Sequence, residues 1–483
     1  MGKLQTIAKD TAIYGLSSII GRFLNYLLVP LYTAQLSAAS GGYGVITNMY
    51  AYVALILVIL TFGMETTYFR FTNKTHTDSE VVYSTTLISV GTVSALFALL
   101  VILFITPISQ LMGYGDHPEW VWVMAVTVAI DSFLCIPFAH LRQQKKAIKF
   151  AALKLLNIVV SILLNLIYFA WMDGEDVGYA FYINLACTGM LAVCLFTEYT
   201  GFRWTMDTKL LRTMLSYSWP ILILGVAGIL NQTADKMLFP YIYEGDDMLE
   251  QLGIYGACSK IAMIMAMITQ AFRFAYEPIV FSGVKDKGQH EMYEQAMKYF
   301  IIFTLLAFLL VVGYIDILKY IVRNSDYWVG LKVVPIVMAA EIMMGIYFNL
   351  SFWYKIIDKT IWGAWFSGIG CVVLLAVNFI FVPKYGYMAC AWGGFAGYGV
   401  AMITSYIVGQ KYYPLNYPLK DITLYTILAA IAFVAMTLLH EKLSMWLSIA
   451  INTLLILAFI ALIIKRDLPL SKLPIIGKKF KKK

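Results

Sequence analysis

The most informative stretch of the sequence is residues 41–69, which read GGYGVITNMYAYVALILVILTFGMETTYF. Their central run of mainly apolar residues has the length of about 20 that a helix needs to cross a bilayer. Residues 253–281, GIYGACSKIAMIMAMITQAFRFAYEPIVF, align with this stretch after a shift of 212 positions, with eight of 29 positions identical. Both copies begin with a Gly-x-Tyr-Gly pattern and carry a glutamate near their end. The chain therefore predicts a membrane protein with an internal repeat.

The composition supports a lipid environment. Of the 483 residues, 60% are apolar and only 13% are charged, and the mean hydropathy is +0.75. Soluble domains are about 45–50% apolar and about 25% charged. These values disfavour a soluble enzyme, a nucleic-acid-binding module and a disordered scaffold, although the net charge is +8.

Apolar segments of membrane-spanning length recur along the whole chain. Their runs are too long for the short alternating strands of a barrel, so we expect an all-α polytopic membrane protein. We predict fourteen spans, at 11–33, 43–63, 82–106, 120–140, 150–171, 178–198, 213–233, 252–272, 299–315, 332–352, 361–382, 386–408, 421–439 and 445–464.

The positions of Lys and Arg test this count independently. With a cytoplasmic N-terminus, 27 of the 36 basic residues fall on the cytoplasmic side. Six fall in loops on the other side: Lys236, Lys319, Arg323, Lys332, Lys384 and Lys442. Cytoplasmic loops are enriched in Lys and Arg, so both termini are predicted to be cytoplasmic.

The repeat pairs the second span with the eighth, which run in the same direction. This spacing predicts two pseudo-symmetric lobes of six helices each, at 1–200 and 201–410. Residues 411–483 then form two further helices and a basic cytoplasmic tail. Two similar lobes around a central cavity suit alternating access.

These features resemble a known family. The 6 + 6 + 2 arrangement, Arg22 in the first span and Leu-Ser-x(4)-Gly-Tyr-Gly at 36–44 are similar to the polysaccharide transporters, which include the Wzx-type O-antigen flippases. The similar stretch in the second repeat copy, Leu-Gly-Ile-Tyr-Gly at 252–256, fits the same family pattern. This family belongs to the multidrug/oligosaccharidyl-lipid/polysaccharide (MOP) superfamily, whose lobes are MATE-like. Arg22 has no basic counterpart in the seventh span, which departs from a symmetric pair of arginines.

The resemblance implies a flippase rather than an enzyme. Its substrate would be an undecaprenyl-diphosphate-linked repeat unit of O-antigen, capsule or exopolysaccharide, moved across the bacterial cytoplasmic (inner) membrane in lipopolysaccharide or polysaccharide biosynthesis. Its partners would be this lipid-linked oligosaccharide, membrane lipids and a glycan polymerase of the same pathway, with no nucleic acid. No cofactor or metal is expected, and coupling to a Na⁺ gradient, an H⁺ gradient or the membrane potential stays open.

Ionisable residues inside a membrane are costly and therefore mark candidate sites. Arg22 shares a helical face with Ser18 and Asn25. Its planar guanidinium can hold two oxygens of a diphosphate at once, and a structural pair with a carboxylate is the alternative. Lys260 occupies the repeat position of Asn48, and we expect it to line the same cavity.

Further candidates lie near the ends of the spans. We expect diphosphate-binding cations at a cytoplasmic mouth, with Arg70 and Arg273, and gating or ion-coupling groups at Glu65, Glu277, Asp131, Asp235, Asn231 and Glu341. Each has a structural alternative: an i, i+4 ion pair for Arg273 with Glu277, an ordinary helix end for Asn231 and Asp235, and cation partners for Asp131 and Glu341.

Two other functions remain open. An ion-coupled multidrug exporter of the same superfamily would be expected to have an acidic cavity. A membrane glycan polymerase or ligase would be expected to need a sizeable outer loop with catalytic residues, whereas the predicted outer loops are short.

Overall fold

A computed structural model shows an all-helical membrane protein. It describes residues 20, 24, 26–74, 78–200, 204–282, 289–357, 359–440 and 442–467, and within them the chain forms helices and no strand. Among the described residues, eleven helices are long and apolar enough to cross a membrane. Gly178–Cys194 is a shorter apolar helix, and Tyr387–Tyr412 is of spanning length but is not among the eleven. The count of fourteen therefore stays a prediction.

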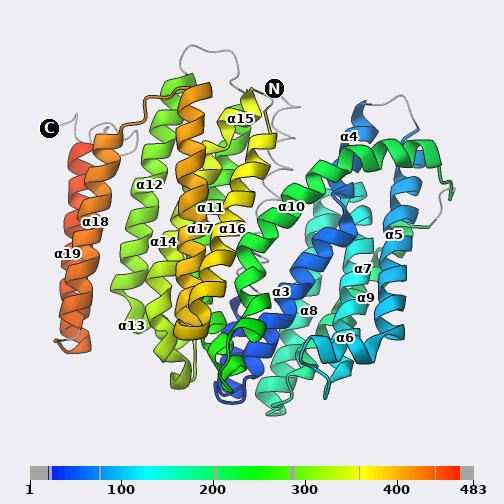
Figure 1. The fold of residues 1–483 in the computed structure, drawn as a ribbon, viewed down its shortest axis with the longest axis horizontal. Coiled ribbons are helices and arrows are strands. Elements are labelled where there is room, and N and C mark those ends of the chain that lie inside the picture. The colour runs from blue at the N-terminus through cyan, green and yellow to red at the C-terminus, as the bar shows by residue number, and fades with distance from the viewer. Residues whose placement is uncertain are drawn as a thin grey trace.

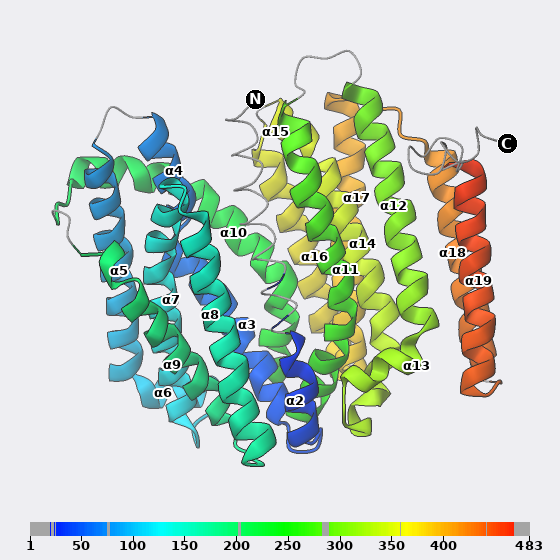
Figure 2. The same ribbon diagram turned by 180° about the vertical axis from the view of Figure 1, so that it is seen from behind.

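The helices form two groups with α10 running between them (Figure 1). The N-terminal bundle contains α3 (Gly42–Thr61), α4 (Met64–Lys74), α5 (Ser79–Leu103), α6 (Ile105–Leu111), α7 (Pro118–Gln143), α8 (Ala147–Asn165) and α9 (Gly178–Cys194). The C-terminal bundle contains α11 (Met248–Ser282), α12 (Gln289–Gly313), α13 (Ile315–Leu318), α14 (Val334–Leu350), α15 (Phe352–Ile356), α16 (Ile361–Tyr385) and α17 (Tyr387–Tyr412). The short α2 (Leu28–Gln35) lies between α8 and α11 when the molecule is seen from behind (Figure 2).

Helix α10 (Thr208–Ile242) connects the two bundles. Asp207 caps its first turn by accepting hydrogen bonds from the backbone amides of residues 209 and 210, which satisfies two otherwise unpaired donors. Its first half contacts the N-terminal bundle, where the hydroxyls of Ser218 and Thr67 lie 2.6 Å apart. Its second half reaches the C-terminal bundle, where the Asn231 amide donates to the Ser367 carbonyl at 2.8 Å.

Helices α18 (Leu419–His440) and α19 (Met445–Arg466) pack beside α12. At one end, the buried Lys298 ammonium contacts Asp421 at 2.6 Å and also Asp467. At the other end, the Asn452 amide donates to the Gly313 carbonyl at 2.9 Å. These polar contacts hold the pair of helices at both ends of α12.

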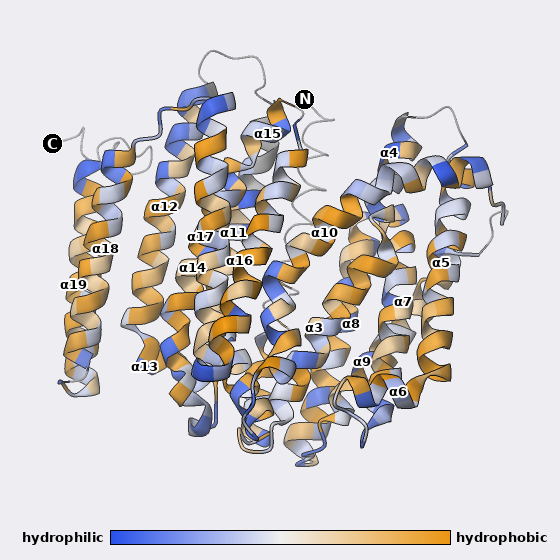
Figure 3. Ribbon diagram, viewed as in Figure 1, coloured by the Kyte–Doolittle hydropathy of each residue, from blue (hydrophilic) through white to orange (hydrophobic). Residues whose placement is uncertain are grey.

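The outward-facing sides of the helices are apolar, as a lipid environment requires. On α5, exposed leucines recur at helical spacing: Leu96, Leu99, Leu100 and Leu103. Figure 3 shows hydrophobic residues along the lengths of α5, α18 and α19, and hydrophilic residues gathered toward the ends of the molecule. The structure therefore fits a multi-pass membrane protein.

The two repeat copies pack against each other as α3 and α11. A Cβ atom at Gly44 would lie only 1.9 Å from the Leu249 carbonyl oxygen, and one at Gly253 would lie 3.0 Å from the Gly44 amide nitrogen. Only glycine permits so close an approach of two backbones. The glycines that the repeats share are thus needed because the two copies touch.

Candidate functional site

A cavity of about 820 Å³ lies between the two bundles. Helices α2, α3, α8 and α9 line one side, and α10, α11, α14, α16 and α17 line the other. A cavity of this size that meets several helices at a bundle interface is the usual form of a ligand site in a helical protein.

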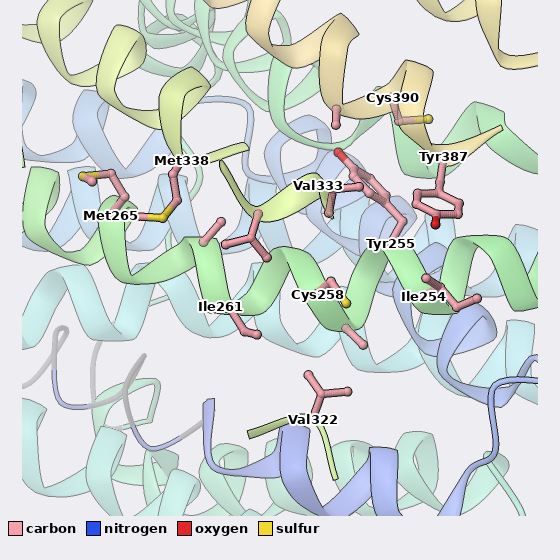
Figure 4. Close-up of a cluster of buried hydrophobic side chains, with 14 of the residues drawn as sticks. Ile254, Tyr255, Cys258, Ile261, Met265, Val322, Val333, Met338, Tyr387 and Cys390 are labelled. Atoms are coloured by element: carbon pink, nitrogen blue, oxygen red, sulfur yellow. The ribbon is translucent and has the colours of Figure 1, made fainter. Parts of the chain in front are cut away.

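Helix α11 has two opposite faces. Ile254, Cys258, Ile261 and Met265 recur every three or four residues and are buried, and Figure 4 shows them among Val322, Val333 and Met338. The cavity face has the same spacing, with Gly256, Lys260, Met263, Gln270 and Arg273. This amphipathic pattern holds two basic side chains toward the cavity.

Lys260 lies on the cavity wall, and no described residue of opposite charge pairs with it. No hydrogen bond or ion pair joins its ammonium to another described residue, and the like charge of Lys236 is near enough to repel it. Arg273 is further along the same face, with its guanidinium 5.1 Å from the centre of the Phe348 ring. An anion in the cavity would therefore stabilise the charge of Lys260, which no described residue offsets.

Asp235 and Lys236 form a polar corner where α10 meets α11. The Tyr255 hydroxyl donates to one Asp235 oxygen at 2.7 Å, and the Lys236 ammonium contacts both oxygens at 3.1 Å. Asp235 is buried, and these two donors offset its negative charge. The opposite charges of Asp235 and Lys236 largely cancel, so this pair contributes less net charge to the cavity than Lys260 does.

Helices α10 and α14 add two further predicted residues to the lining. Asn231 donates to the carbonyls of Ala227 and Ser367, and these bonds fix its amide between α10 and α16. Glu341 lines the cavity from α14. The described lining thus carries three basic residues, Lys236, Lys260 and Arg273, against two acidic residues, Asp235 and Glu341.

The opposite side of the cavity is polar but uncharged in the described residues. Asn157, Ser161 and Asn165 are spaced i, i+4 and i+8 on α8 and therefore share one face. The Asn165 carbonyl oxygen accepts from Tyr32 at 2.7 Å, and its amide donates to the Ser161 carbonyl. From α9, Asn184 donates to the Tyr50 hydroxyl at 3.1 Å.

Four predicted residues lie away from the cavity lining. The Asn48 amide donates to the Lys236 carbonyl and its oxygen accepts from Tyr114, both at 2.8 Å, so it joins α3 to α10. Glu65 pairs with Arg142. Arg70 and Asp131 contact residues outside the cavity lining. The Arg70 guanidinium lies 4.1 Å from the centre of the Tyr217 ring, and the Asp131 carboxylate accepts a hydrogen bond from the Thr188 hydroxyl at 3.2 Å.

Part of the prediction falls outside the description. Ser18, Arg22 and Asn25 are not among the described residues, and neither is the side chain of Glu277. Their roles stay predictions. Among the residues that are described, no group of His, Cys, Asp and Glu could hold a metal ion.

Several lining residues were not predicted from the sequence. Lys236 was expected in an outer loop, whereas α10 continues to Ile242 and places Lys236 on the cavity wall. Neither Asn157 nor Asn184 was expected to line the cavity. The signal available in the sequence was an asparagine within an otherwise apolar helix, but this signal does not tell which face points to the cavity.

Comparisons with known proteins agree with this architecture. A family model described as "Polysaccharide biosynthesis protein" matches residues 39–325. A search of curated protein sequences found no match.

Solved structures with similar folds share little sequence. A lipid II flippase, MurJ, in an inward closed conformation, has a TM-score of 0.74 at 14% identity, over 93% of this chain and 98% of that one. An inward-facing multidrug resistance MATE family transporter of the MOP superfamily has a TM-score of 0.64 at 13% identity, over 81% and 94%. A MOP superfamily transporter from Pyrococcus furiosus, described as having a binding pocket of reverse polarity, has a TM-score of 0.54 at 15% identity, over 83% and 95%.

At these identities the solved structures establish the fold, and the family model establishes the relationship. It covers more than half of the chain, including α3, α11 and the α10 helix between the bundles. The resemblance drawn from the repeat motifs and Arg22 is thereby confirmed: this chain belongs to the polysaccharide biosynthesis protein family and has the fold of the MOP superfamily.

Proposed function

We propose that this protein is a flippase for a lipid-linked oligosaccharide, which it moves across the cytoplasmic membrane by alternating access. The substrate would be an undecaprenyl-diphosphate-linked repeat unit of O-antigen, capsule or exopolysaccharide. In this proposal the lobes at 1–200 and 201–410 rock against each other, and the predicted orientation places both termini in the cytoplasm.

The observation that carries the proposal is Lys260, a cation whose charge no described residue offsets, in a cavity between two bundles. A diphosphate is a compact anion, and a hydrogen bond to a charged group contributes about 1.5–3 kcal/mol. Arg273 on the same face of α11 supplies a second cation, so the diphosphate can pass along this helix. The polyprenyl tail stays in lipid, where burying it costs nothing.

A multidrug exporter is the main alternative. An exporter of cationic drugs is expected to need an acidic cavity, whereas the described lining has three basic residues against two acidic ones, and Asp235 is neutralised locally. A polymerase or ligase is less well supported, because it would be expected to need a sizeable outer loop with catalytic residues, whereas the predicted outer loops are short. Coupling to Na⁺, H⁺ or the membrane potential, and contact with a glycan polymerase, remain parts of the proposal to be tested.

Reconstituted vesicles test the proposal directly. Purified protein is inserted into liposomes with the lipid-linked oligosaccharide, and transfer between leaflets is scored by the access of a glycan-modifying enzyme from outside. The Lys260→Gln variant removes the charge while keeping a polar side chain. Loss of one charge-assisted contact predicts transfer slowed by about 10- to 100-fold.

Lys411→Gln is the matched control, because Lys411 is exposed at the end of α17 and does not line the cavity. It should transfer at the wild-type rate. Transfer that is equally fast in Lys260→Gln and in wild type would remove the support that this cavity gives to the proposal. Export of a cationic dye by vesicles that leave the lipid untouched would favour the multidrug exporter.

A further inference from the structure

The two sides of the cavity differ in the charge of their described lining residues. All five charged residues of the described lining lie on α10, α11 and α14. The described lining of α3, α8 and α9 contains only neutral groups, and its polar members are Tyr43, Thr47, Tyr50, Asn157, Ser161, Asn165 and Asn184. We call Tyr50, Asn157 and Asn184 the amide wall.

Asn157 is the central member of this wall. Its side-chain carbonyl oxygen is buried and accepts no hydrogen bond from the described residues, although the residue lines the cavity. A buried acceptor without a donor is costly, so such a group in a native structure calls for an explanation. This oxygen is enclosed, so a small rotation of the Asn157 side chain toward the cavity would let a ligand hydroxyl supply the missing donor.

Asn184 and Tyr50 give the wall both donors and acceptors. The Asn184 amide donates to the Tyr50 hydroxyl at 3.1 Å, which leaves the Tyr50 hydroxyl hydrogen available to donate in turn. By contrast Asn165 already uses its oxygen with Tyr32 and one N–H with the Ser161 carbonyl. On this side of the cavity the open hydrogen-bonding capacity therefore lies on α9, α3 and the middle of α8, and the opposite side has open polar atoms of its own, at Ser259 and Gln270 among others.

We propose that the amide wall binds a neutral sugar next to the diphosphate, while Lys260 and Arg273 on the opposite side bind the diphosphate itself. This inference rests on the proposed function and adds the chemistry of the sugar. Hydroxyl and acetamido groups match neutral amides and phenols, because each partner can both donate and accept. A sugar carboxylate at the same place would be desolvated without a cation to compensate it.

The test measures lipid binding to the full-length protein in nanodiscs. Three probes are compared: undecaprenyl diphosphate alone, undecaprenyl diphosphate carrying one N-acetylhexosamine, and undecaprenyl diphosphate carrying one hexuronic acid. Wild type should bind the neutral glycolipid more tightly than the acidic one. Asn157→Ala and Asn184→Ala should each weaken the neutral glycolipid by about five- to tenfold and change the sugar-free lipid by less than about twofold.

Two further variants separate binding from folding. Asn184→Lys introduces a cation into the amide wall and should reverse the preference, so that the acidic glycolipid binds better than the neutral one. Asn416→Ala is the matched control, because Asn416 is exposed outside the cavity and its known hydrogen bond uses its backbone amide. It should leave all three affinities unchanged.

The outcomes distinguish this inference from the proposed function. If wild type binds none of the three lipids, the proposed function fails. If wild type binds them and the Asn157 and Asn184 variants weaken the sugar-free lipid as much as the neutral glycolipid, or weaken neither, the amide wall is wrong and the proposed function stands. A gain of acidic-glycolipid binding in Asn184→Lys requires a folded protein and supports the wall.

Discussion

The contact between α3 and α11 makes a sharp prediction about Gly44→Ala. The new Cβ atom would lie 1.9 Å from the Leu249 carbonyl oxygen, and Cβ atoms essentially never approach other atoms closer than 3.0 Å. The two helices must therefore separate by about 1 Å at this point. Since both partners are helical backbone, no side-chain rotation can relieve the clash.

Overpacking of this kind costs about 1–3 kcal/mol. If the contact exists only when the cavity is closed at this end, the cost falls on that one state. A bias of this size shifts a two-state equilibrium by about 5- to 150-fold toward the state in which α3 and α11 are apart. Gly256→Ala should act more weakly, because its Cβ meets the side chain of Thr47 rather than backbone, although the Thr47 Cβ at 3.0 Å cannot rotate away.

Spin labels at Ser40 and Asp246 measure this shift, because both positions are exposed beside the first turns of α3 and α11. The exposed Cys194 is first replaced by serine so that it does not react. Gly44→Ala should move the distance distribution to longer values. Gly189→Ala is the control, since a Cβ there meets nothing within 4 Å. A distribution in Gly44→Ala that matches both the control and wild type would refute the idea that this contact closes the cavity.

Three other substitutions test which polar residues are structural. Lys298→Ala leaves Asp467 without its lysine partner, while Asp421 still pairs with Arg466, and should destabilise the protein by about 3 kcal/mol, seen as a lower unfolding temperature in detergent than for Lys411→Ala. Asn48→Ala breaks two buried hydrogen bonds and should cost about 2 kcal/mol in unfolding while the folded protein still binds undecaprenyl diphosphate. Glu65→Gln should change the free energy of unfolding by less than about 1 kcal/mol and leave leaflet transfer intact, because both side chains of its pair with Arg142 are about two-fifths exposed. Loss of transfer in this variant would support a gating role for Glu65.

The all-helical fold could be predicted because its signals are long and periodic. Apolar runs set the spans, and the shared glycines of 41–69 and 253–281 marked a place where the two repeat copies touch. Helix ends were harder. The seventh span was predicted to end at 233 because Asp235 and Lys236 look like a loop, but these opposite charges contact each other and allow α10 to continue to Ile242.

The cavity residues were only partly predictable, because residue type does not reveal direction. Asn48, Asn157 and Asn378 all lie in apolar helices. Asn157 lines the cavity, Asn48 bonds to α10 and Tyr114, and Asn378 is buried elsewhere. A shift of one position along a helix turns a side chain by about 100°, and only packing against neighbouring helices fixes which face looks inward.

Charge in the membrane therefore has to be sorted by whether the protein already uses it. Asp235 is taken up by Lys236 and Tyr255, and these contacts would exist without any substrate. Lys260 differs, because no described residue offsets its charge and Lys236 repels it. A cation inside the membrane is destabilising unless an opposite charge or water offsets part of its desolvation. An anionic substrate group that visits the cavity meets that requirement, and this is why the functional argument depends on Lys260 more than on the net charge of the lining.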